Sequence, residues 1–374
     1  MKNNKMTAVI ISILCTILAL TVGGTALLIA YDTILSNQNG DNESETESES
    51  VNDEIPITPP MELADERHLT FLKTEDDMGY TVKGLFGEVG AIKIVIPETF
   101  KGLPVIGIEN GAFSSSSDLV TVVMPDTLKY IGEGAFESCN NLKDVTLSKN
   151  LEYVGDYAFE GCDALELNEY DNALYFGSDE NPYIVLMQAK DEGIESCKVH
   201  DDTKIIYASA FYNCTELDEV SIPDGIRQIG IGAFEECYDL FPNPDETSPE
   251  YTYTKDADYL GNENNPFLVL VRVRGGKNIT AIEVHSDTKI IAPGAFVGCE
   301  KLESINIPDS LQVIGEYAFE GCKSLESVTV SSGASWYVFV SDAVYQNNVI
   351  STNDSEEFLV NLIKKNYACS FIKK

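Results

Sequence analysis

Basic residues are scarce in this chain of 374 residues: 25 Lys and Arg stand against 61 Asp and Glu, giving a formal net charge of −36. Only four of the basic residues are Arg. Nucleic-acid binding requires Lys and Arg to neutralise phosphates, and an anionic membrane surface repels a chain of this charge. The balance therefore excludes nucleic-acid partners and favours neutral or cationic ones.

Groups that carry chemistry are also few. Of three His, His200 and His285 follow Val at matching places in two related segments, and His68 stands alone. The sequence contains no G-x-S-x-G motif, no phosphate-binding G-x-x-x-x-G-K-[ST] loop, no D-x-D-x-D-G calcium loop and no C-x-x-C zinc pattern. Nucleophilic catalysis needs a nucleophile beside an oriented base. We therefore expect no catalytic, cofactor-binding or metal-binding residues, and a protein that is not an enzyme.

An uncharged stretch of 23 residues, Ala8–Ala30, lies near the N-terminus. At about 1.5 Å per residue, a helix of this length reaches roughly 34 Å, enough to cross a bilayer core of about 30 Å. Lys2 and Lys5 precede it and an acidic segment follows, so the positive-inside rule places residues 1–7 in the cytoplasm and exports the rest. The sequence therefore predicts a transmembrane signal anchor over residues 8–30.

Two other interpretations of this stretch stay open. A cleaved signal peptide usually has an apolar region of about 7–15 residues and a small-x-small site, whereas this stretch is longer and lacks a clean site before Tyr31. A lipoprotein could use Cys15, although the bulky Leu14 precedes it. The mass of the membrane-bound species, compared with the full-length chain, distinguishes these cases.

The segment over residues 31–60 is polar and acidic. Between Ser36 and Pro60 it holds seven acidic residues, no basic ones and almost no apolar ones before Ile55. Such a composition buries too little surface to offset its ordering entropy, and its like charges repel one another. We expect a disordered linker that separates the membrane from a folded region.

An internal repeat begins after this linker. An Ala-Phe pair recurs with Phe at 113, 136, 159, 211, 234, 296 and 319, and the spacing within each uninterrupted run is 23 residues. The composite pattern is L-x-x-V-x-I-P-D-x-L-x-x-I-G-x-x-A-F-x-x-C-x-x. L-x-x-V-x-I predicts a short strand, Pro-Asp a turn, and I-G a tight bend that glycine permits. The spacing of A-F-x-x-C-x-x-L fits one or two turns of helix.

Stacked copies of this unit would bury their apolar positions, Phe on Phe and Leu on Leu, and join their strands in a parallel sheet. Cys follows Phe by three residues in six units, at 139, 162, 214, 237, 299 and 322. A residue that recurs at one phase forms a ladder, and a free Cys behaves as a small buried apolar residue. We expect buried thiols, with disulfides between coils and a metal site as the open alternatives.

This pattern closely resembles the BspA-like leucine-rich repeat of bacterial surface antigens. The resemblance is carried by the seven Ala-Phe pairs and by the triplets Met124–Asp126, Ile222–Asp224 and Ile307–Asp309, and it covers about Thr81 to Val330. It implies an α/β repeat fold over residues 61–330, a right-handed solenoid with a parallel β-sheet and short helical turns. It also implies a bacterial surface or secreted protein, with adhesion or protein binding as the expected activity.

Two longer units interrupt the repeat. Both contain Asn-Pro-aromatic followed by β-branched residues, and Pro182 and Pro266 lie 84 residues apart, so a larger cassette has been duplicated. Two strand patterns around a turn predict a β-hairpin insertion in each cassette, at about residues 165–195 and 241–280. Insertions of this kind often lie on the binding face. Packing of their aromatic rings against the solenoid is the alternative.

Residues 331–374 depart from the repeat and contain the single Trp, Trp336. Terminal units of solenoids are atypical because they cover the last coil, so we expect a C-terminal capping element here. A sugar-binding module is the alternative.

Recognition is expected at exposed positions of the strands and at aromatic residues of the second cassette, since aromatic residues are favoured in interfaces. The candidate ligand-binding residues are Thr121, Asp144, Glu219, Asn306, Thr329, Tyr251 and Tyr253. We predict a binding or adhesion protein of the bacterial cell membrane, single-pass, with its C-terminal domain outside and a protein or glycan ligand. A structural envelope scaffold without a soluble ligand, and an enzyme with an unrecognised site in the insertions or tail, are the alternatives.

Overall fold

The computed structural model describes residues 61–74, 77–87, 90–241, 254–329, 335–340, 350–351 and 369–373. The chain divides into two compact units, Met1–Ile57 and Thr58–Lys374, and all described residues belong to the second. The predicted cytoplasmic segment, the anchor over 8–30 and the linker over 31–60 lie outside the described residues. Within the part that is described, no helix has the length and apolar character needed to span a bilayer.

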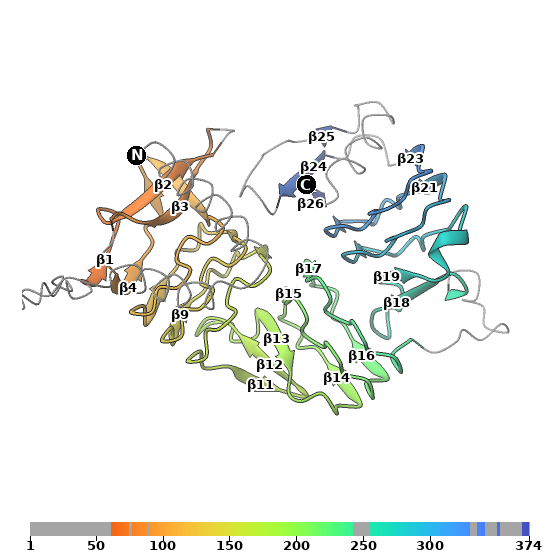
Figure 1. Cartoon of the computed structure of the whole chain (residues 1–374), viewed down its shortest axis with the longest axis horizontal. Helices are drawn as coiled ribbons and strands as arrows, with labels where there is room; N and C mark the ends of the chain where they lie inside the picture. Colours follow the sequence, from red (N-terminus) through yellow and green to blue (C-terminus); the bar gives the residue numbers. More distant parts are fainter. Residues whose placement is uncertain are drawn as a thin grey trace, which may run out of the picture. The chain divides into compact units, whose positions relative to one another are not determined.

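Each regular repeat forms one coil of a solenoid, and the coils follow one another in sequence order (Figure 1). The first side of a coil is a parallel strand made by the L-x-x-V-x-I segment. Its middle residue is apolar and packs inward, as Val122 does in register between Ile94 and Val145. The sheets on this side are β1 (Met61–Ala64) with β4 (Ala91–Val95), β7 (Thr121–Val123) and β9 (Asp144–Thr146); β14 (Ser196–Lys198) with β16 (Glu219–Ser221); and β21 (Ser304–Asn306) with β23 (Ser327–Thr329).

The second side is a strand of two residues, formed by the x-I or x-V pair of L-x-x-I-G. One sheet in the order β10-β8-β6-β3-β2 contains β10 (Tyr153–Val154), β8 (Tyr130–Ile131), β6 (Leu103–Ile108), β3 (Tyr80–Leu85) and β2 (Leu69–Lys73), and β5 (Thr99–Phe100) pairs with β6. The later short strands are β15 (Ile205–Ile206), β17 (Gln228–Ile229), β20 (Ile290–Ile291) and β22 (Val313–Ile314). Successive short strands pair in parallel, so every coil contributes to two ladders.

The third side contains no helix, so the predicted helical turns are wrong for the described repeats. Residues two before and two after Phe have left-handed backbone, as at Gly134 (φ 56°) and Ser138 (φ 59°) around Phe136. An α-helix cannot continue through such residues. Their N–H groups instead reach the next coil, with Gly134 N donating to Asp156 O at 3.0 Å and Ser138 N to Glu160 O at 2.7 Å. The helix whose bounds the structure describes is the short 3₁₀ helix η1 (Gly276–Asn278), which lies in the second cassette and not in a regular repeat. A parallel β-solenoid of leucine-rich-repeat type therefore replaces the expected α/β repeat.

The glycine of I-G has a different role from the predicted bend. A Cβ built on Gly155 would lie 2.4 Å from Glu133 N of the preceding coil, and one on Gly230 would lie 2.3 Å from Ala208 N. These glycines therefore let stacked backbones approach closely, and they are not among the glycines with left-handed backbone. Three coils do not follow directly on a regular coil, so no backbone lies as close to this position. Their residues at the position of the glycine are Glu109, Tyr207 and Ala292.

The predicted ladder of Phe side chains is confirmed. Phe136 stacks on Phe113 at 5.3 Å and on Phe159 at 5.4 Å, and the pairs Phe211–Phe234 and Phe296–Phe319 stack likewise. The six ladder cysteines are buried free thiols, as is Cys197. The Cys139 thiol donates to Phe113 O at 3.1 Å, and burial raises the pKa of Cys139 to about 11. Protonated, hydrogen-bonded thiols of this kind act as packing residues.

Each cassette contains an antiparallel hairpin. In the first it is formed by β12 (Ala173–Phe176) and β13 (Val185–Ala189), with β11 (Asn168–Tyr170) paired antiparallel to β12, and in the second by β18 (Ala257–Leu260) and β19 (Val269–Val273). The outgoing strand of each pair returns to the solenoid, because β13 pairs in parallel with β15 and β19 pairs in parallel with β20. The hairpins thus extend the short-strand ladder rather than project from it.

The C-terminal strands complete the last sheet. They are β24 (Ser335–Val340), β25 (Ile350–Ser351) and β26 (Cys369–Lys373). β26 pairs antiparallel with β22, placing Ile372 opposite Val313, and β24 pairs with β26. An uncovered strand edge offers unpaired N–H and C=O groups to other chains, so β26 protects the edge of β22.

Three side chains connect coils that are distant in sequence. The Gln228 amide makes two hydrogen bonds of 2.8 Å with the backbone of Val154, as a neighbouring strand would. The Tyr153 hydroxyl donates to Glu316 at 2.6 Å, and Phe159 N donates to the Tyr207 hydroxyl at 3.1 Å. These contacts bring the third coil beside coils that follow each of the two cassettes.

Candidate ligand-binding face

Outward-facing residues of the long strands form rows on either side of the buried middle residue. Asp144 lies opposite Thr121 in β9 and β7, and Thr329 lies opposite Asn306 in β23 and β21. Glu219 lies opposite Ser196 of β14. Thr121 is half-buried and the other predicted strand residues are exposed. Stacking therefore makes neighbours of residues that are 23 positions apart, because the register of the parallel strands matches the repeat.

The structure does not gather all predicted residues into one site. The predicted strand residues belong to three separate sheets: Thr121 and Asp144 to the first, Glu219 to the second, and Asn306 and Thr329 to the third. Asn306 and Thr329 are also third residues of their strands, whereas Thr121, Asp144 and Glu219 are first residues. Tyr251 and Tyr253 lie outside the described residues. Each group stays a prediction on its own sheet.

One groove opens on this face, between β14–β16 and the second cassette. It encloses about 1050 Å³, and Glu219 is the predicted residue that lines it. The cassette forms its far wall because Ile222 N donates to Gly261 O at 2.8 Å and the Asn262 side-chain amide donates to Ile222 O at 2.8 Å. These bonds seat Gly261 and Asn262 where the next strand of the sheet would lie.

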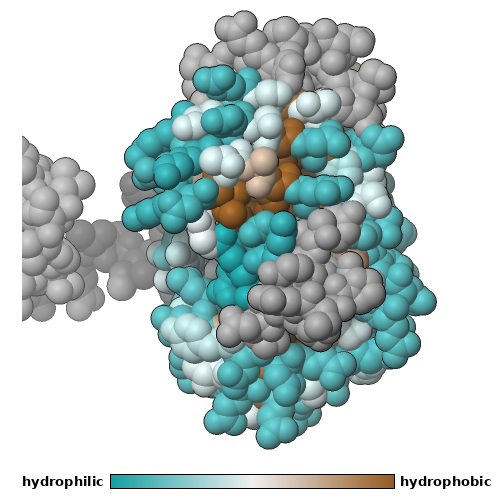
Figure 2. Space-filling model, turned by 90° about the vertical axis from the view of Figure 1, so that its right-hand side faces the viewer, coloured by the Kyte–Doolittle hydropathy of each residue, from teal (hydrophilic) through white to brown (hydrophobic). Residues whose placement is uncertain are grey.

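The groove is strongly acidic. Its six exposed carboxylates are Asp171, Asp201, Asp218, Glu219, Asp224 and Glu263. Lys198 is the one basic residue that lines it, and Asp224 is also paired with Lys289 at 3.3 Å. The face drawn in Figure 2 is likewise mainly hydrophilic, with a smaller apolar area near its middle. A groove of this charge attracts cationic groups.

The edge of β14 beside this groove is satisfied by side chains of the first cassette. The Asp171 carboxylate accepts from Lys198 N at 2.6 Å, and the Asn172 amide donates to Ser196 O at 2.8 Å. The turn between β11 and β12 thus replaces a neighbouring strand. The sequence alone gave no sign that Asp171 and Asn172 have this role, because their partners lie more than 20 residues away.

Aromatic residues of the cassettes pack against the solenoid. Tyr183 stacks on His200 with ring centroids 4.0 Å apart, and Tyr175 is fully buried. Phe267 stacks on His285 in the same way in the second cassette, also at 4.0 Å. These described rings therefore pack the cassettes against the solenoid, which is the alternative to a role in ligand binding.

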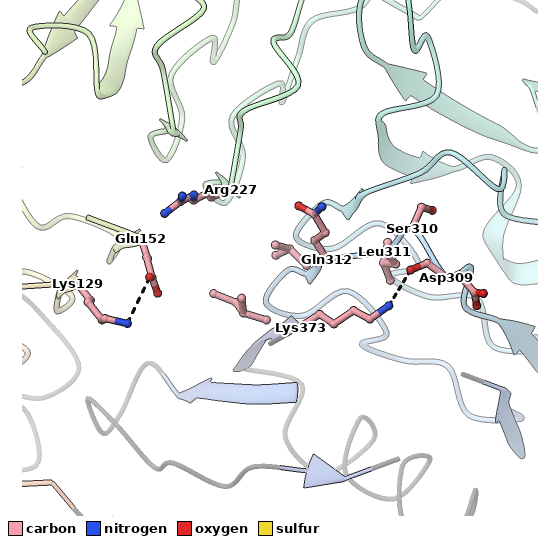
Figure 3. Close-up of a pocket in the computed structure, with 10 residues that line it drawn as sticks. Lys129, Glu152, Arg227, Asp309, Ser310, Leu311, Gln312 and Lys373 are labelled. Atoms are coloured by element: carbon pink, nitrogen blue, oxygen red, sulfur yellow. Dashed lines mark hydrogen bonds and ion pairs between the residues drawn. The ribbon is translucent and has the colours of Figure 1, made fainter. Parts of the chain in front are cut away.

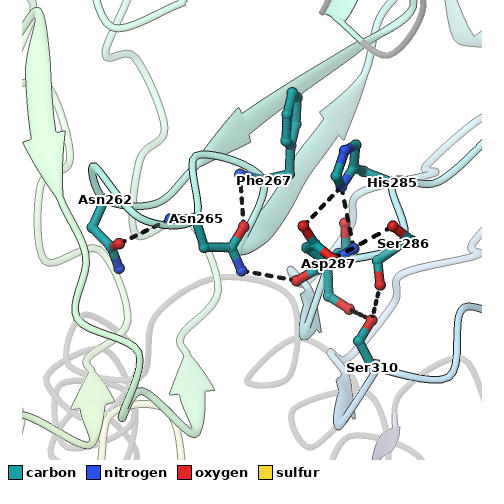
Figure 4. A network of polar contacts seen from close by, with 8 residues as sticks. Asn262, Asn265, Phe267, His285, Ser286, Asp287 and Ser310 are labelled. Atoms are coloured by element: carbon teal, nitrogen blue, oxygen red, sulfur yellow. Dashed lines mark hydrogen bonds and ion pairs between the residues drawn. The ribbon is translucent and has the colours of Figure 1, made fainter.

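Polar contacts hold the turn of the second cassette in place (Figure 4). The Asn265 side chain accepts from Phe267 N at 3.1 Å and donates to Asp287 O at 2.9 Å. His285 Nδ1 accepts from Asp287 N at 3.2 Å, so this imidazole orients a turn. Asn181 and His200 make the equivalent bonds in the first cassette. Among the described residues, no group of three potential metal ligands gathers at one point.

Comparison with known families gives a match over most of the folded region. The model described as "BspA type Leucine rich repeat region", with six copies, matches residues 70–178, 189–242 and 274–359. The chain belongs to the BspA-type leucine-rich-repeat family. The predicted family is therefore confirmed. No curated protein matches the chain.

Solved structures of bacterial leucine-rich repeat proteins resemble this member of the family. The T. pallidum leucine rich repeat protein is 20% identical, with 70% of this chain and 89% of that chain covered and a TM-score of 0.31. A leucine rich cell surface protein from Faecalibacterium prausnitzii A2-165 is 23% identical, with 73% and 77% covered and a TM-score of 0.31. A leucine-rich repeat protein from Bacteroides ovatus is 23% identical, with 70% and 69% covered and a TM-score of 0.31. Likenesses of this size carry no argument about function.

Proposed function

We propose that this BspA-type leucine-rich repeat protein is a non-catalytic binding protein displayed outside a bacterial cell membrane. Its ligand is a protein or glycan at the cell surface, held against the acidic groove beside β14 and β16. The groove carries this proposal, because a predicted recognition residue, Glu219, is among the residues that line it.

The size of the groove favours a segment of a polymer. Small-molecule sites usually enclose about 300–1,000 Å³, and this groove of about 1050 Å³ is open along the strand face. Its walls also present the exposed side-chain amide of Asn264, which can donate and accept hydrogen bonds. A peptide or oligosaccharide with cationic groups fits this combination of length, polarity and charge.

The membrane location rests on the sequence. The uncharged stretch over residues 8–30 is long enough to span a bilayer, and the basic residues precede it. An anchor of this kind would hold the repeats outside the cell, where the acidic surface keeps them soluble and off anionic lipid.

The proposal is tested by presenting the full-length chain, in a mild detergent, to host matrix proteins and wall polysaccharides. A stoichiometric, saturable ligand is expected. Glu219→Lys should weaken its binding by at least about tenfold, because a cation replaces a carboxylate that lines the groove. Glu62→Lys is the matched control, since Glu62 is an exposed residue of β1, on another sheet, and is not a candidate ligand-binding residue.

Three outcomes contradict the proposal. Equal losses in Glu219→Lys and Glu62→Lys would show that the groove is not the binding site. Absence of any saturable ligand across both panels would favour a structural envelope scaffold. Turnover of a hydrolase substrate by the same preparation would instead favour an enzyme.

A further inference from the structure

A second pocket lies among the short strands and shares no residue with the acidic groove. It encloses about 720 Å³. It is lined by Lys129, Glu152, Arg227, the segment Asp309–Val313, and Ile372 with Lys373. These residues come from four coils and from the C-terminal strand, so the pocket exists only where distant coils meet.

The repeat explains why polar side chains converge here. Lys129, Glu152, Arg227 and Gln312 each stand directly before a short strand, β8, β10, β17 and β22. The bonds of Gln228 to Val154 set Arg227 near Glu152, and the bond of Tyr153 to Glu316 sets Glu152 near the last coil. The same phase of four coils therefore lines one pocket.

Arg227 differs from the other three arginines of the chain. Arg67 pairs with Asp65, and both Arg272 and Arg274 pair with the buried Asp258. Arg227 is exposed and makes no ion pair within the described part of the chain. A guanidinium without a carboxylate is unexpected in a protein with 61 acidic and 25 basic residues.

The other two cations of the pocket are already engaged. Lys129 Nζ lies 3.5 Å from Glu152, and Lys373 Nζ donates to Asp309 O at 2.7 Å. Figure 3 shows the Arg227 side chain directed toward the side of the pocket formed by the Lys129–Glu152 pair, with Gln312 and Lys373 on the opposite side. Arg227 is thus the cation of this pocket that is free to meet an incoming group.

The remaining lining mixes polar and apolar side chains, the polar ones being Asp309, Ser310 and Gln312. Leu311 and Val313 are almost wholly covered by their neighbours, so the apolar surface is offered by the half-buried Ile372, which lies opposite Val313 in the paired strands β22 and β26. An apolar surface beside a free guanidinium suits a ligand with one charged end and one apolar end. The volume of 720 Å³ is that of an ordinary small-molecule site.

We propose that this pocket binds a small organic anion, with its carboxylate or phosphate group on Arg227 and its apolar body against Ile372. The planar guanidinium presents parallel N–H donors that match both anions in a bidentate geometry. The proposal is independent of the ligand of the acidic groove, because the two surfaces have no residue in common.

Calorimetric titration of the full-length chain with phenyl phosphate and benzoate tests this. Each should bind saturably at one site, and the tighter of the two identifies the preferred anion. Inorganic phosphate lacks the apolar body and benzyl alcohol lacks the charge, so both should bind several-fold more weakly. Arg227→Gln should weaken the aromatic anion by at least about tenfold, the effect of losing a charged hydrogen bond. Glu152→Gln should strengthen its binding, since it removes the nearest opposing carboxylate.

Arg67→Gln is the matched control, because it removes an arginine outside the pocket, and it should leave the affinity unchanged. Melting temperatures of all variants establish that they are folded. The proposal is overturned if Arg227→Gln binds as tightly as the natural chain. It is also overturned if the folded natural chain shows no saturable binding of either aromatic anion at millimolar concentration. Loss of groove binding in Glu219→Lys leaves this result unaffected, so the two proposals fail separately.

Discussion

The left-handed residues around each Phe are the least conventional feature of the coil at the scale of single residues. Every regular coil has one such residue two positions before Phe and another two positions after it. The first position holds Gly in four coils, Tyr in two and Ser in one, at Gly111, Gly134, Tyr157, Ser209, Gly232, Gly294 and Tyr317. A non-glycine residue in this conformation costs about 1–2 kcal/mol, so the Tyr coils carry strain that the Gly coils lack.

Replacing Tyr157 by Gly should therefore stabilise the protein. Tyr157 is 58% exposed and has φ 58°, so its ring contributes little packing. The substitution relieves the backbone strain, but glycine also adds conformational entropy to the unfolded chain. The net effect is a free energy of unfolding higher by about 0.5–1 kcal/mol. At the equivalent position, Gly134→Ala should lower it by about 1 kcal/mol, because a Cβ is strained at φ 56°. No larger clash is expected, since the new Cβ meets only the flexible Glu137 side chain, at 3.1 Å. Urea unfolding followed by circular dichroism measures both changes.

Tyr212→Gly is the control for this pair. Tyr212 is similarly exposed, at 48%, and is not among the residues with positive φ. Its replacement should lower the free energy of unfolding by the entropy of glycine alone. If Tyr157→Gly and Tyr212→Gly destabilise equally, the strain is absent.

Single residues of the core were predictable and those of the turns were not. Phe136 and Cys139 recur at one phase, and a repeated apolar residue has only the core to occupy. Tyr157 and Ser138 have no shared chemistry that would mark them as left-handed. Gly155 was predicted correctly as necessary but for the wrong reason, because close approach of two backbones is visible only when the coils are stacked.

At the scale of secondary-structure elements, Gln228 completes a strand edge with its side chain. Its amide donates to Val154 O and accepts from Val154 N, both at 2.8 Å, and Gln228 is itself buried. Gln228→Ala removes both bonds and leaves the buried backbone N–H and C=O of Val154 in β10 unpaired. A loss of this kind costs about 1–3 kcal/mol. We expect the free energy of unfolding to fall by about 2–4 kcal/mol in total.

The comparison for this prediction is Gln188→Ala, at an exposed residue of β13. It should change stability by less than about 0.5 kcal/mol. Gln228→Glu is more informative still, because a carboxylate accepts from Val154 N but cannot donate to Val154 O, and it should be less stable than the natural chain. Equal stability of the Gln228 and Gln188 variants to Ala would contradict the structural role of the amide.

The strands were easier to predict than the segment that follows them. L-x-x-V-x-I alternates apolar and exposed residues, and a strand is the element with that period. The spacing of Phe159, Cys162 and Leu165 fits a helix and a pair of tight turns equally well. The left-handed backbone at Tyr157 and Gly161 is incompatible with a helix and forms tight turns. Hydrogen bonds to the next coil replace those that a helix would make within itself.

At the scale of the whole molecule, the contacts between distant coils had no signal in the sequence. Arg227 and Lys129 are ordinary exposed residues of their own repeats, and they line one pocket only because Gln228 and Tyr153 join coils 74 and 163 residues apart. A repeat pattern predicts which coils are neighbours in order. It does not predict where the cassettes bring separate stretches of solenoid together.

The contact between Tyr153 and Glu316 makes stability depend on pH. Burial, together with the nearby carboxylate of Glu133, raises the pKa of Glu316 to about 7 and that of Asp156 to about 6, although the hydrogen bond from Tyr153 opposes the shift of Glu316. An unfolded chain releases these protons near pH 4. Between about pH 4 and pH 7 the folded state therefore holds protons that the unfolded state has lost. The contribution of Glu316 to stability is complete below this range and is lost as the pH rises through it.

Glu316→Gln should remove most of this dependence. The Gln carbonyl still accepts from the Tyr153 hydroxyl, but it carries no charge at any pH, so no buried carboxylate faces Asp156 and Glu133. At about pH 8 the variant should exceed the natural chain in free energy of unfolding by on the order of 2–3 kcal/mol, and near pH 4 the two should agree. Urea unfolding at a series of pH values measures the difference. Glu320→Gln, at an exposed residue four positions later, controls for the general loss of negative charge. If stability depends on pH in the same way in both variants, Glu316 does not hold its proton in the folded protein. The contact between the coils would then not depend on protonation of Glu316.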